Sequence, residues 1–128
     1  MPRVLVVEDN PVNLELVVAL LEQEGCDVLV AETADAALHL ARTGGPELIL
    51  MDVQLPGMTG YEATRCLKSD PATAGIPVVA LTAQAMRGDD ARAAEAGCAA
   101  YLAKPLDRQK FHETLHRLLR RPTAAGKE

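Results

Sequence analysis

The sequence predicts an α/β protein in which five strands form one parallel sheet, doubly wound, with helices on both faces. Short runs of β-branched and aliphatic residues recur five times, and a stretch with helical periodicity follows each run. Short connections join these segments, and a regular alternation of strand and helix is typical of such a sheet. The predicted strands lie at Arg3–Val7, Asp27–Ala31, Leu48–Met51, Val78–Thr82 and Ala100–Ala103.

The first two helices have recognisable ends. Asn10 and Pro11 mark the start of the first helix, because asparagine is a favoured N-cap and proline is favoured in the first turn. Gly25 marks its end, since glycine commonly follows a helix. After the second strand comes an alanine-rich helix, which we expect to end at Gly44.

The other three helices follow the remaining strands. An irregular stretch at 52–59 precedes the third helix, for which Thr59 and Glu62 have the spacing of a capping box. The fourth helix should end near Gly97, and Asp107 is the expected cap of the fifth. The fifth helix carries an apolar stripe at Phe111, Leu115, Leu118 and Leu119.

Length and composition limit the number of domains and the kinds of molecule that the protein could bind. The chain has 128 residues, 48% hydrophobic and 24% charged, which is enough for one core. We expect one domain at 1–121 and a disordered tail at 122–128. A net charge of −5, with only two Tyr, one Phe and no Trp, argues against binding DNA or RNA. The local basic run at 108–121 is typical of a solvated helix face.

The compartment is predicted from three further observations. Cys26, Cys66 and Cys98 are far apart and form no CxxC pair, which indicates reduced thiols. No apolar run has the length of a membrane span, and the N-terminus lacks the order of a signal peptide. We therefore expect a soluble cytoplasmic protein with no membrane partner.

Residues with acidic, hydroxyl or ammonium side chains lie at the carboxyl ends of four of the five predicted strands. In open parallel sheets, ligands bind outside the carboxyl ends of the strands. If the first and third strands are neighbours, three acids meet at that edge, with a hydroxyl and an ammonium beside them. The residues are Glu8, Asp9, Asp52, Thr82 and Lys104.

Three carboxylates at one place repel one another. Two unit charges 4 Å apart repel by about 4 kcal/mol at an effective dielectric near 20. A raised pKa or a bound cation relieves this repulsion, and Mg²⁺ suits oxygen ligands near phosphate. Asp52 has the acid pair on one side and Thr82 and Lys104 on the other. It is therefore the best candidate for a nucleophile that forms an acyl phosphate. Taken singly, each residue also fits an ordinary role as a helix-dipole partner, a cap, a turn former or a surface lysine.

The residues from Arg3 to about Arg121 resemble a response-regulator receiver domain, which implies a flavodoxin-like fold with strand order 2-1-3-4-5. The resemblance rests on four sequence motifs that occur in order. They are VVEDNPVN with Glu8 and Asp9, LILMDVQLPGMTGYEATR with Asp52, ALTA with Thr82, and AYLAKPL with Lys104 and Pro105. The string from LTAQAMRGDD to AKPL resembles stand-alone chemotaxis-like and cell-division regulators, and the receivers of hybrid histidine kinases, equally well.

The resemblance implies a role for each site residue. Asp52 accepts a phosphoryl group from a histidine kinase or a histidine phosphotransfer protein. Glu8, Asp9, Asp52 and the backbone carbonyl of Gln54 hold Mg²⁺, and Lys104 pairs with the phosphoryl oxygens. The bond to Pro105 is expected to be cis.

The resemblance also implies a switch. The Thr82 hydroxyl moves toward the phosphoryl group and Tyr101 turns inward, which alters the surface of the fourth helix, fifth strand and fifth helix. The alternative for Tyr101 is a half-buried tyrosine with its hydroxyl in water. With only seven residues after Arg121, we expect the downstream effector to be a separate protein. The receiver is expected to dephosphorylate itself and not to act as a turnover enzyme.

Two other classes of function fit the same acids. One is a Mg²⁺-dependent phosphoryl-transfer hydrolase, although the short loops leave no insertion that could form a substrate pocket. The other is a pseudo-receiver that only binds proteins, against which the complete acid set argues. A receiver excised from a longer hybrid kinase is a third alternative.

One metal motif stands apart from these residues. HETLH at 112–116 fits the HExxH pattern, whose two histidines lie one helical turn apart and can bind zinc. A catalytic zinc needs a third protein ligand, and none follows at a suitable spacing. The sequence therefore favours exposed helix histidines at His112 and His116.

Overall fold

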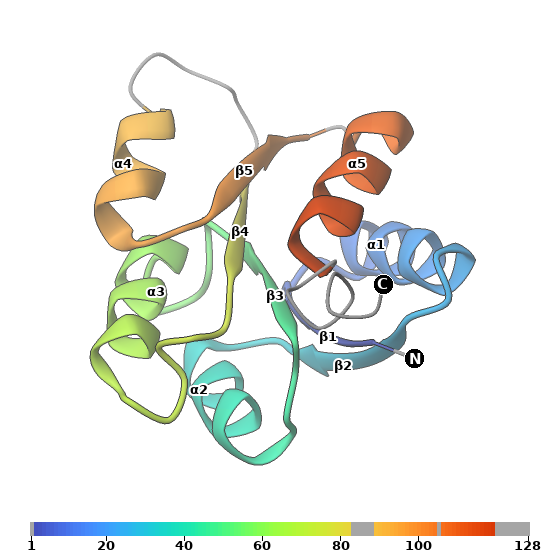
Figure 1. Ribbon diagram of the computed structural model, residues 1–128. Coiled ribbons are helices and arrows are strands. Elements are labelled where there is room, and N and C mark those ends of the chain that lie inside the picture. The colour runs from blue at the N-terminus through green and yellow to red at the C-terminus, as the bar shows by residue number, and fades with distance from the viewer. Residues whose placement is uncertain (1, 83–88, 105, 120–128) are drawn as a thin grey trace.

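The computed structural model describes residues 2–82, 89–104 and 106–119. Five strands form one parallel sheet in the order β2-β1-β3-β4-β5, which confirms the predicted fold class and strand order (Figure 1). The strands are β1 (Arg3–Val7), β2 (Asp27–Ala31), β3 (Leu48–Asp52), β4 (Val78–Thr82) and β5 (Ala100–Ala103). The helices are α1 (Pro11–Gln23), α2 (Ala34–Thr43), α3 (Gly60–Ser69), α4 (Asp89–Ala96) and α5 (Arg108–Leu119).

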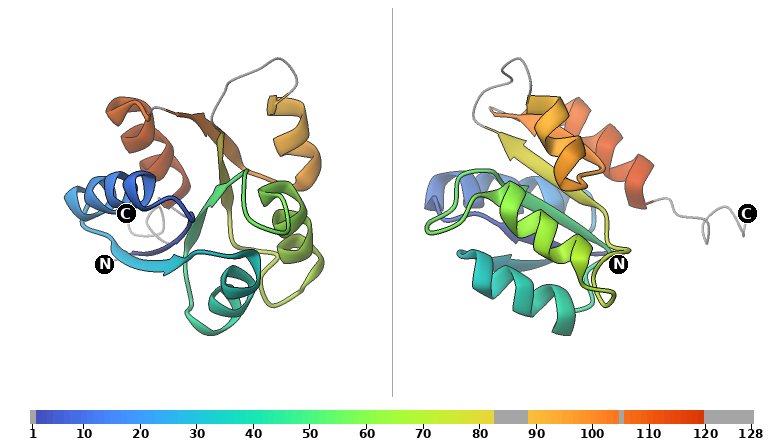
Figure 2. Two further views of the ribbon diagram at one scale, coloured as in Figure 1. Left: turned by 180° about the vertical axis from the view of Figure 1, so that it is seen from behind. Right: turned by 90° about the vertical axis from the view of Figure 1, so that its left-hand side faces the viewer.

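The helices form two layers on opposite faces of the sheet. Helices α1 and α5 cover one face, and α2, α3 and α4 cover the other (Figures 1 and 2). Alternate residues of a strand point to opposite faces, so Val4 and Val6 join the core under α1 and α5, while Leu5 and Val7 join the core under α2 and α3. Burial on both faces explains why the central strands are continuously apolar.

The predicted caps set where the helices begin. The Asn10 side chain accepts hydrogen bonds from the backbone N–H groups of Val12 and Asn13 at the start of α1. Thr59 and Glu62 form the complete capping box of α3. Asp107 accepts from two backbone N–H groups at the start of α5, at 2.8 and 3.1 Å. Each such cap stabilises a helix by about 1 kcal/mol.

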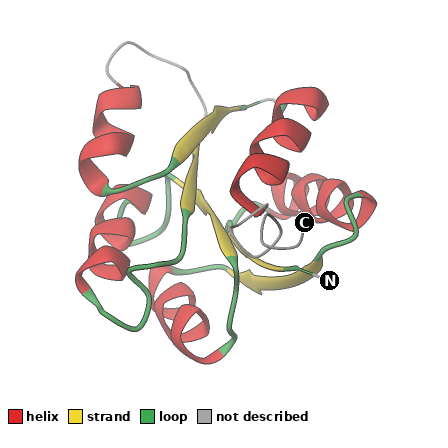
Figure 3. Ribbon diagram, in the orientation of Figure 1, coloured by secondary structure: helices red, strands yellow, loops and turns green. Residues whose placement is uncertain are grey.

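Strand register brings the polar residues to one edge. Val7 of β1 is paired with Met51 of β3, so Glu8 lies beside Asp52. Asp52 is paired with Leu81 of β4, one residue before Thr82. The register therefore places the carboxyl ends of these strands at one edge of the sheet, whose five strands are drawn in yellow in Figure 3.

Two sequence-based expectations concern the ends of the chain and the membrane. The predicted tail at 122–128 lies outside the described residues. None of the described helices combines the length and the apolar character needed to cross a bilayer.

Candidate functional site

Three carboxylates converge at the carboxyl edge of the sheet, as predicted. One oxygen from each of Glu8, Asp9 and Asp52 lies within 4.8 Å of the others. Glu8 is completely buried and Asp52 is 5% exposed, whereas Asp9 is exposed. They line a cleft of about 420 Å³, whose other lining residues are Asn10, Asn13, Gln54, Leu55, Pro56 and Lys104.

Lys104 joins two of these carboxylates. Its Nζ lies 3.0 Å from Oε1 of Glu8 and 3.3 Å from Oδ1 of Asp52. The backbone N–H of Lys104 donates to the carbonyl of Thr82 at 2.7 Å, which extends the β4–β5 pairing to the lysine itself. One ammonium group therefore pairs with two of the three carboxylates, and an excess of negative charge remains in the cleft.

The pKa of Asp52 is raised to about 6. Burial is the largest cause, because it disfavours the charged form. The neighbouring Glu8 carboxyl raises the pKa further, while the ammonium of Lys104 and the backbone N–H of Gln54 lower it. The protein thus holds this carboxylate in an unfavourable state at neutral pH, which an additional cation would relieve.

Backbone groups hold the two buried acids in place. The N–H of Gln54 donates to Oδ1 of Asp52, and the N–H of Asn10 donates to Oε2 of Glu8, each at 3.2 Å. Gly60, at the start of α3, lies so close to the carbonyl of Asp52 that a Cβ there would overlap it. The N–H of Gly60 also donates to the carbonyl of Val53 at 2.7 Å. We did not predict this supporting role for Gly60 from the sequence; its position directly after the cap Thr59 was the available signal.

The predicted switch residues lie on the next two strands. Thr82 is 6% exposed at the end of β4. Tyr101, on β5, is half-buried and packs against a small cluster that includes Ala93 and Ala96 of α4. Tyr101 therefore borders α4, one of the elements of the expected switch surface. Pro105 lies outside the described residues.

A model of the response regulator receiver domain family matches residues 4–116. The chain belongs to this family. It is 45% identical, over 116 residues, to the polar-differentiation response regulator DivK of Brucella anthropi; the alignment covers 90% of this chain and 94% of DivK. Family membership identifies the chain as a signalling protein of two-component systems.

Solved structures agree with this assignment. The receiver domain of the sensor histidine kinase PA1611 from Pseudomonas aeruginosa, with a magnesium ion coordinated in its active-site cleft, superposes with a TM-score of 0.84 at 37% identity. That alignment covers 91% of this chain and 96% of the other. A CheY-like receiver domain protein from Methanospirillum hungatei has a TM-score of 0.82 at 28% identity, covering 92% and 94% of the two chains.

Proposed function

We propose that this receiver accepts a phosphoryl group on Asp52 from a phosphohistidine of a histidine kinase or histidine phosphotransfer protein. One observation carries the proposal: a buried carboxylate with a raised pKa lies in an open cleft, beside two further acids and an ammonium group. A carboxylate in this position can act as the nucleophile of a phosphoryl transfer. The family to which the chain belongs supports the same reaction class.

The transfer forms one bond and breaks another. A carboxylate oxygen of Asp52 attacks phosphorus, the P–N bond of the phosphohistidine breaks, and the imidazole leaves with the electron pair and takes up a proton. Lys104, 3.3 Å from Asp52, is placed to pair with an oxygen of the transferred group. Hydrolysis of the acyl phosphate by the receiver itself would return Asp52 to its starting state.

The donor set of the cleft fits Mg²⁺. Carboxylates and carbonyl oxygens are the ligands that this hard cation prefers. The carboxylates of Glu8, Asp9 and Asp52, with the backbone carbonyl of Gln54, would hold it. The bound ion would supply positive charge to offset the repulsion between the acids and the incoming phosphoryl oxygens. A magnesium ion in the cleft of the similar PA1611 receiver supports this choice.

The proposed output runs through Thr82 and Tyr101 to the surface of α4, β5 and α5. A phosphoryl group adds acceptor oxygens that the Thr82 hydroxyl can bind, and Tyr101 then turns inward toward the space that Thr82 leaves. Arg108, Lys110 and Arg117 are exposed on α5, so this surface suits an acidic effector protein. Reversing the charge at Arg117 should weaken effector binding, and unchanged affinity would contradict this assignment.

A reducing compartment fits the cysteines. Cys26, Cys66 and Cys98 are all free thiols in the structure, which supports a cytoplasmic location.

Phosphorylation by a small donor tests the function. The purified chain is incubated with Mg²⁺ and acetyl phosphate, and its intact mass is measured. Wild type and the control Asp35→Asn, which changes an exposed acid on α2, should each gain one phosphoryl group. Asp52→Asn should gain none. An adduct on Asp52→Asn, or none on wild type, would overturn the proposal, and turnover of an added phosphoester would indicate a hydrolase instead.

A further inference from the structure

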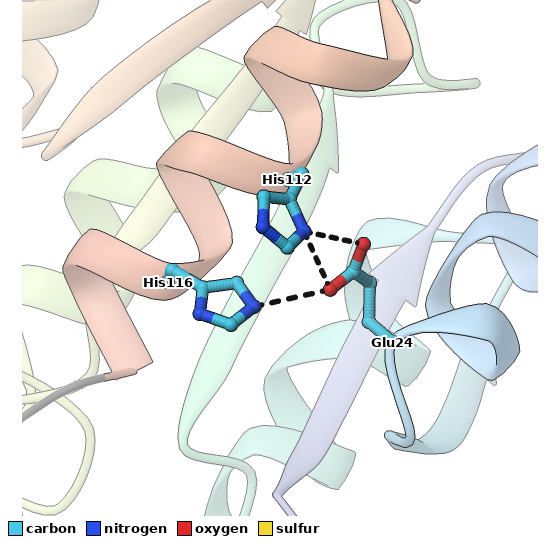
Figure 4. A group of neighbouring side chains, drawn as sticks. All are labelled: Glu24, His112 and His116. Atoms are coloured by element: carbon cyan, nitrogen blue, oxygen red, sulfur yellow. Dashed lines mark hydrogen bonds and ion pairs between the residues drawn. The ribbon is translucent and has the colours of Figure 1, made fainter.

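A second cluster of metal-ligating side chains lies between α1 and α5, away from the acidic cleft. It consists of Glu24, the C-cap of α1, with His112 and His116 of α5 (Figure 4). Nδ1 of His112 lies 2.8 Å and 2.9 Å from the two carboxylate oxygens of Glu24. Nε2 of His116 lies 3.2 Å from Oε1 of the same carboxylate.

The fold brings these residues together from distant parts of the sequence. His112 and His116 are four residues apart, so they lie on the same face of α5, and their ring centroids are 4.1 Å apart. Glu24 precedes His112 by 88 residues and approaches because α1 and α5 pack on the same core. The side chain of Arg108 also donates to Gln23 beside it, at 3.2 Å. No third ligand follows the HExxH motif in the sequence, but Glu24, which precedes it, lies close enough to offer one.

The donor set fits zinc. Two imidazole nitrogens and one carboxylate oxygen form a His₂Glu set, which leaves one position of a tetrahedral ion open. With metal–ligand distances of about 2.0–2.2 Å, the ligand atoms of such a site lie about 3.3 Å apart. The Glu24–histidine distances of 2.8–3.2 Å differ from this value by a few tenths of an ångström. All three ligand atoms lie within 4.8 Å of one another, so rotation of these side chains would bring them to the spacing of a zinc site.

The cluster is accessible from solvent. The side chains of His112 and His116 are 52% and 53% exposed, and that of Glu24 is 20% exposed, so an ion can enter from solvent without opening the core.

We propose that Glu24, His112 and His116 form a zinc site that links the end of α1 to α5. This site differs from the acidic cleft in its donors, because imidazole nitrogen favours Zn²⁺ while an all-oxygen set favours Mg²⁺. Two of its ligands lie on α5, a helix of the proposed output surface, so bound zinc would tie that helix to the end of α1. The inference does not depend on phosphorylation of Asp52.

Competition with a chromophoric zinc chelator tests this site on the tag-free chain, with excess Mg²⁺ present to occupy the acidic cleft. Wild type should bind one Zn²⁺. His112→Ala, His116→Ala and Glu24→Gln should each weaken binding at least tenfold. His39→Ala is the matched control, because His39 is exposed on α2 on the opposite face. Asp52→Asn and Cys66→Ser should also bind like wild type.

Co²⁺ provides a second readout on the same variants. Wild type should give the visible absorption of a tetrahedral site, and His112→Ala/His116→Ala should lose it while keeping its far-ultraviolet circular dichroism. Equal zinc affinity in wild type and this double variant would overturn the proposal and leave an ion-pair cluster only. Loss of binding in Asp52→Asn or Cys66→Ser, with retention in the histidine variants, would also overturn it.

Discussion

The two carboxylate clusters show how burial and partners change the same functional group in opposite directions. In the acidic cleft, Asp52 is 5% exposed and its pKa is raised to about 6, chiefly by burial. At the α1–α5 contact, Glu24 is partly exposed and its pKa is lowered, chiefly by a hydrogen bond from His112. One cluster therefore accumulates negative charge, while the other pairs its charge with imidazole.

The difference indicates in which cluster a bound cation would relieve electrostatic repulsion. The cleft holds three carboxylates against the single ammonium of Lys104, so adding a cation relieves repulsion. The Glu24 cluster has no such excess, and an ion binds there only through the affinity of its donor atoms. Substitutions that remove one charge from either cluster test this contrast.

Removing the ammonium from the cleft should have the largest effect. Lys104→Ala leaves the buried carboxylates of Glu8 and Asp52 without their cation, which we expect to lower the free energy of unfolding by about 3–4 kcal/mol. Urea denaturation at neutral pH, without Mg²⁺, measures this change. Lys110→Ala removes an exposed lysine on α5 and should change stability by less than about 0.5 kcal/mol. Equal effects of the two variants would show that the Lys104 ammonium does not offset repulsion between the carboxylates of the cleft.

The stability of the metal-free protein should depend on pH through Asp52. The folded state binds this proton more tightly than the unfolded state, because the pKa rises from 3.8 to about 6 on folding. The contribution is therefore present below about pH 4 and is lost as the pH rises through about 6, by about 3 kcal/mol in total. The difference between wild type and Asp52→Asn, measured by urea unfolding across this window, isolates the contribution. A difference that does not change with pH would contradict the raised pKa.

Replacing the Asp52 carboxylate, which neighbouring acids repel, should stabilise the fold. Asp52→Asn removes one of three crowded charges and keeps an oxygen that can accept from Gln54, so the metal-free protein should gain about 2 kcal/mol at neutral pH. Thermal unfolding in a chelating buffer measures the gain. Adding Mg²⁺ should then raise the melting temperature of wild type more than that of the variant. A lower melting temperature for metal-free Asp52→Asn would contradict the account.

In the absence of metal, a substitution in the cluster of Glu24, His112 and His116 should change the free energy of unfolding least. Glu24→Gln removes the carboxylate that contacts His112 and His116, and exposed polar contacts of this kind contribute about 0.5 kcal/mol. Because the pKa of Glu24 is lowered on folding, its contribution is present at neutral pH and is lost as the pH falls through the lowered pKa. Glu22→Gln, at an exposed position on α1, is the control. A loss as large as that of Lys104→Ala would remove the contrast between the clusters.

Local patterns were sufficient to predict the fold and the convergence of the acids. Continuous aliphatic runs such as Val78–Thr82 indicate strands buried on both faces, and Asn10 and Thr59 mark helix starts by hydrogen bonds to nearby backbone groups. Once these elements are placed, parallel pairing brings Glu8 and Asp52 to one edge. The structure adds that Lys104 bonds to Glu8 as well as Asp52.

Tertiary packing carries the information that local patterns lack. The approach of Glu24 to His112 depends on how two helices from opposite ends of the chain pack over one face of the sheet. The contact of Gly60 with the backbone of Asp52 depends on the path of the loop before α3. Glu24 and His112 lie 88 residues apart, so no local motif could have joined them.

We propose that Asp52, among the three acids of the cleft, carries the phosphoryl group. Borohydride reduction converts an aspartyl phosphate to homoserine, and peptide mass spectrometry then locates the modified position. After treatment with acetyl phosphate and Mg²⁺, we expect homoserine at position 52 and unmodified aspartate at position 9. Homoserine at position 9, or at any position other than 52, would contradict the account.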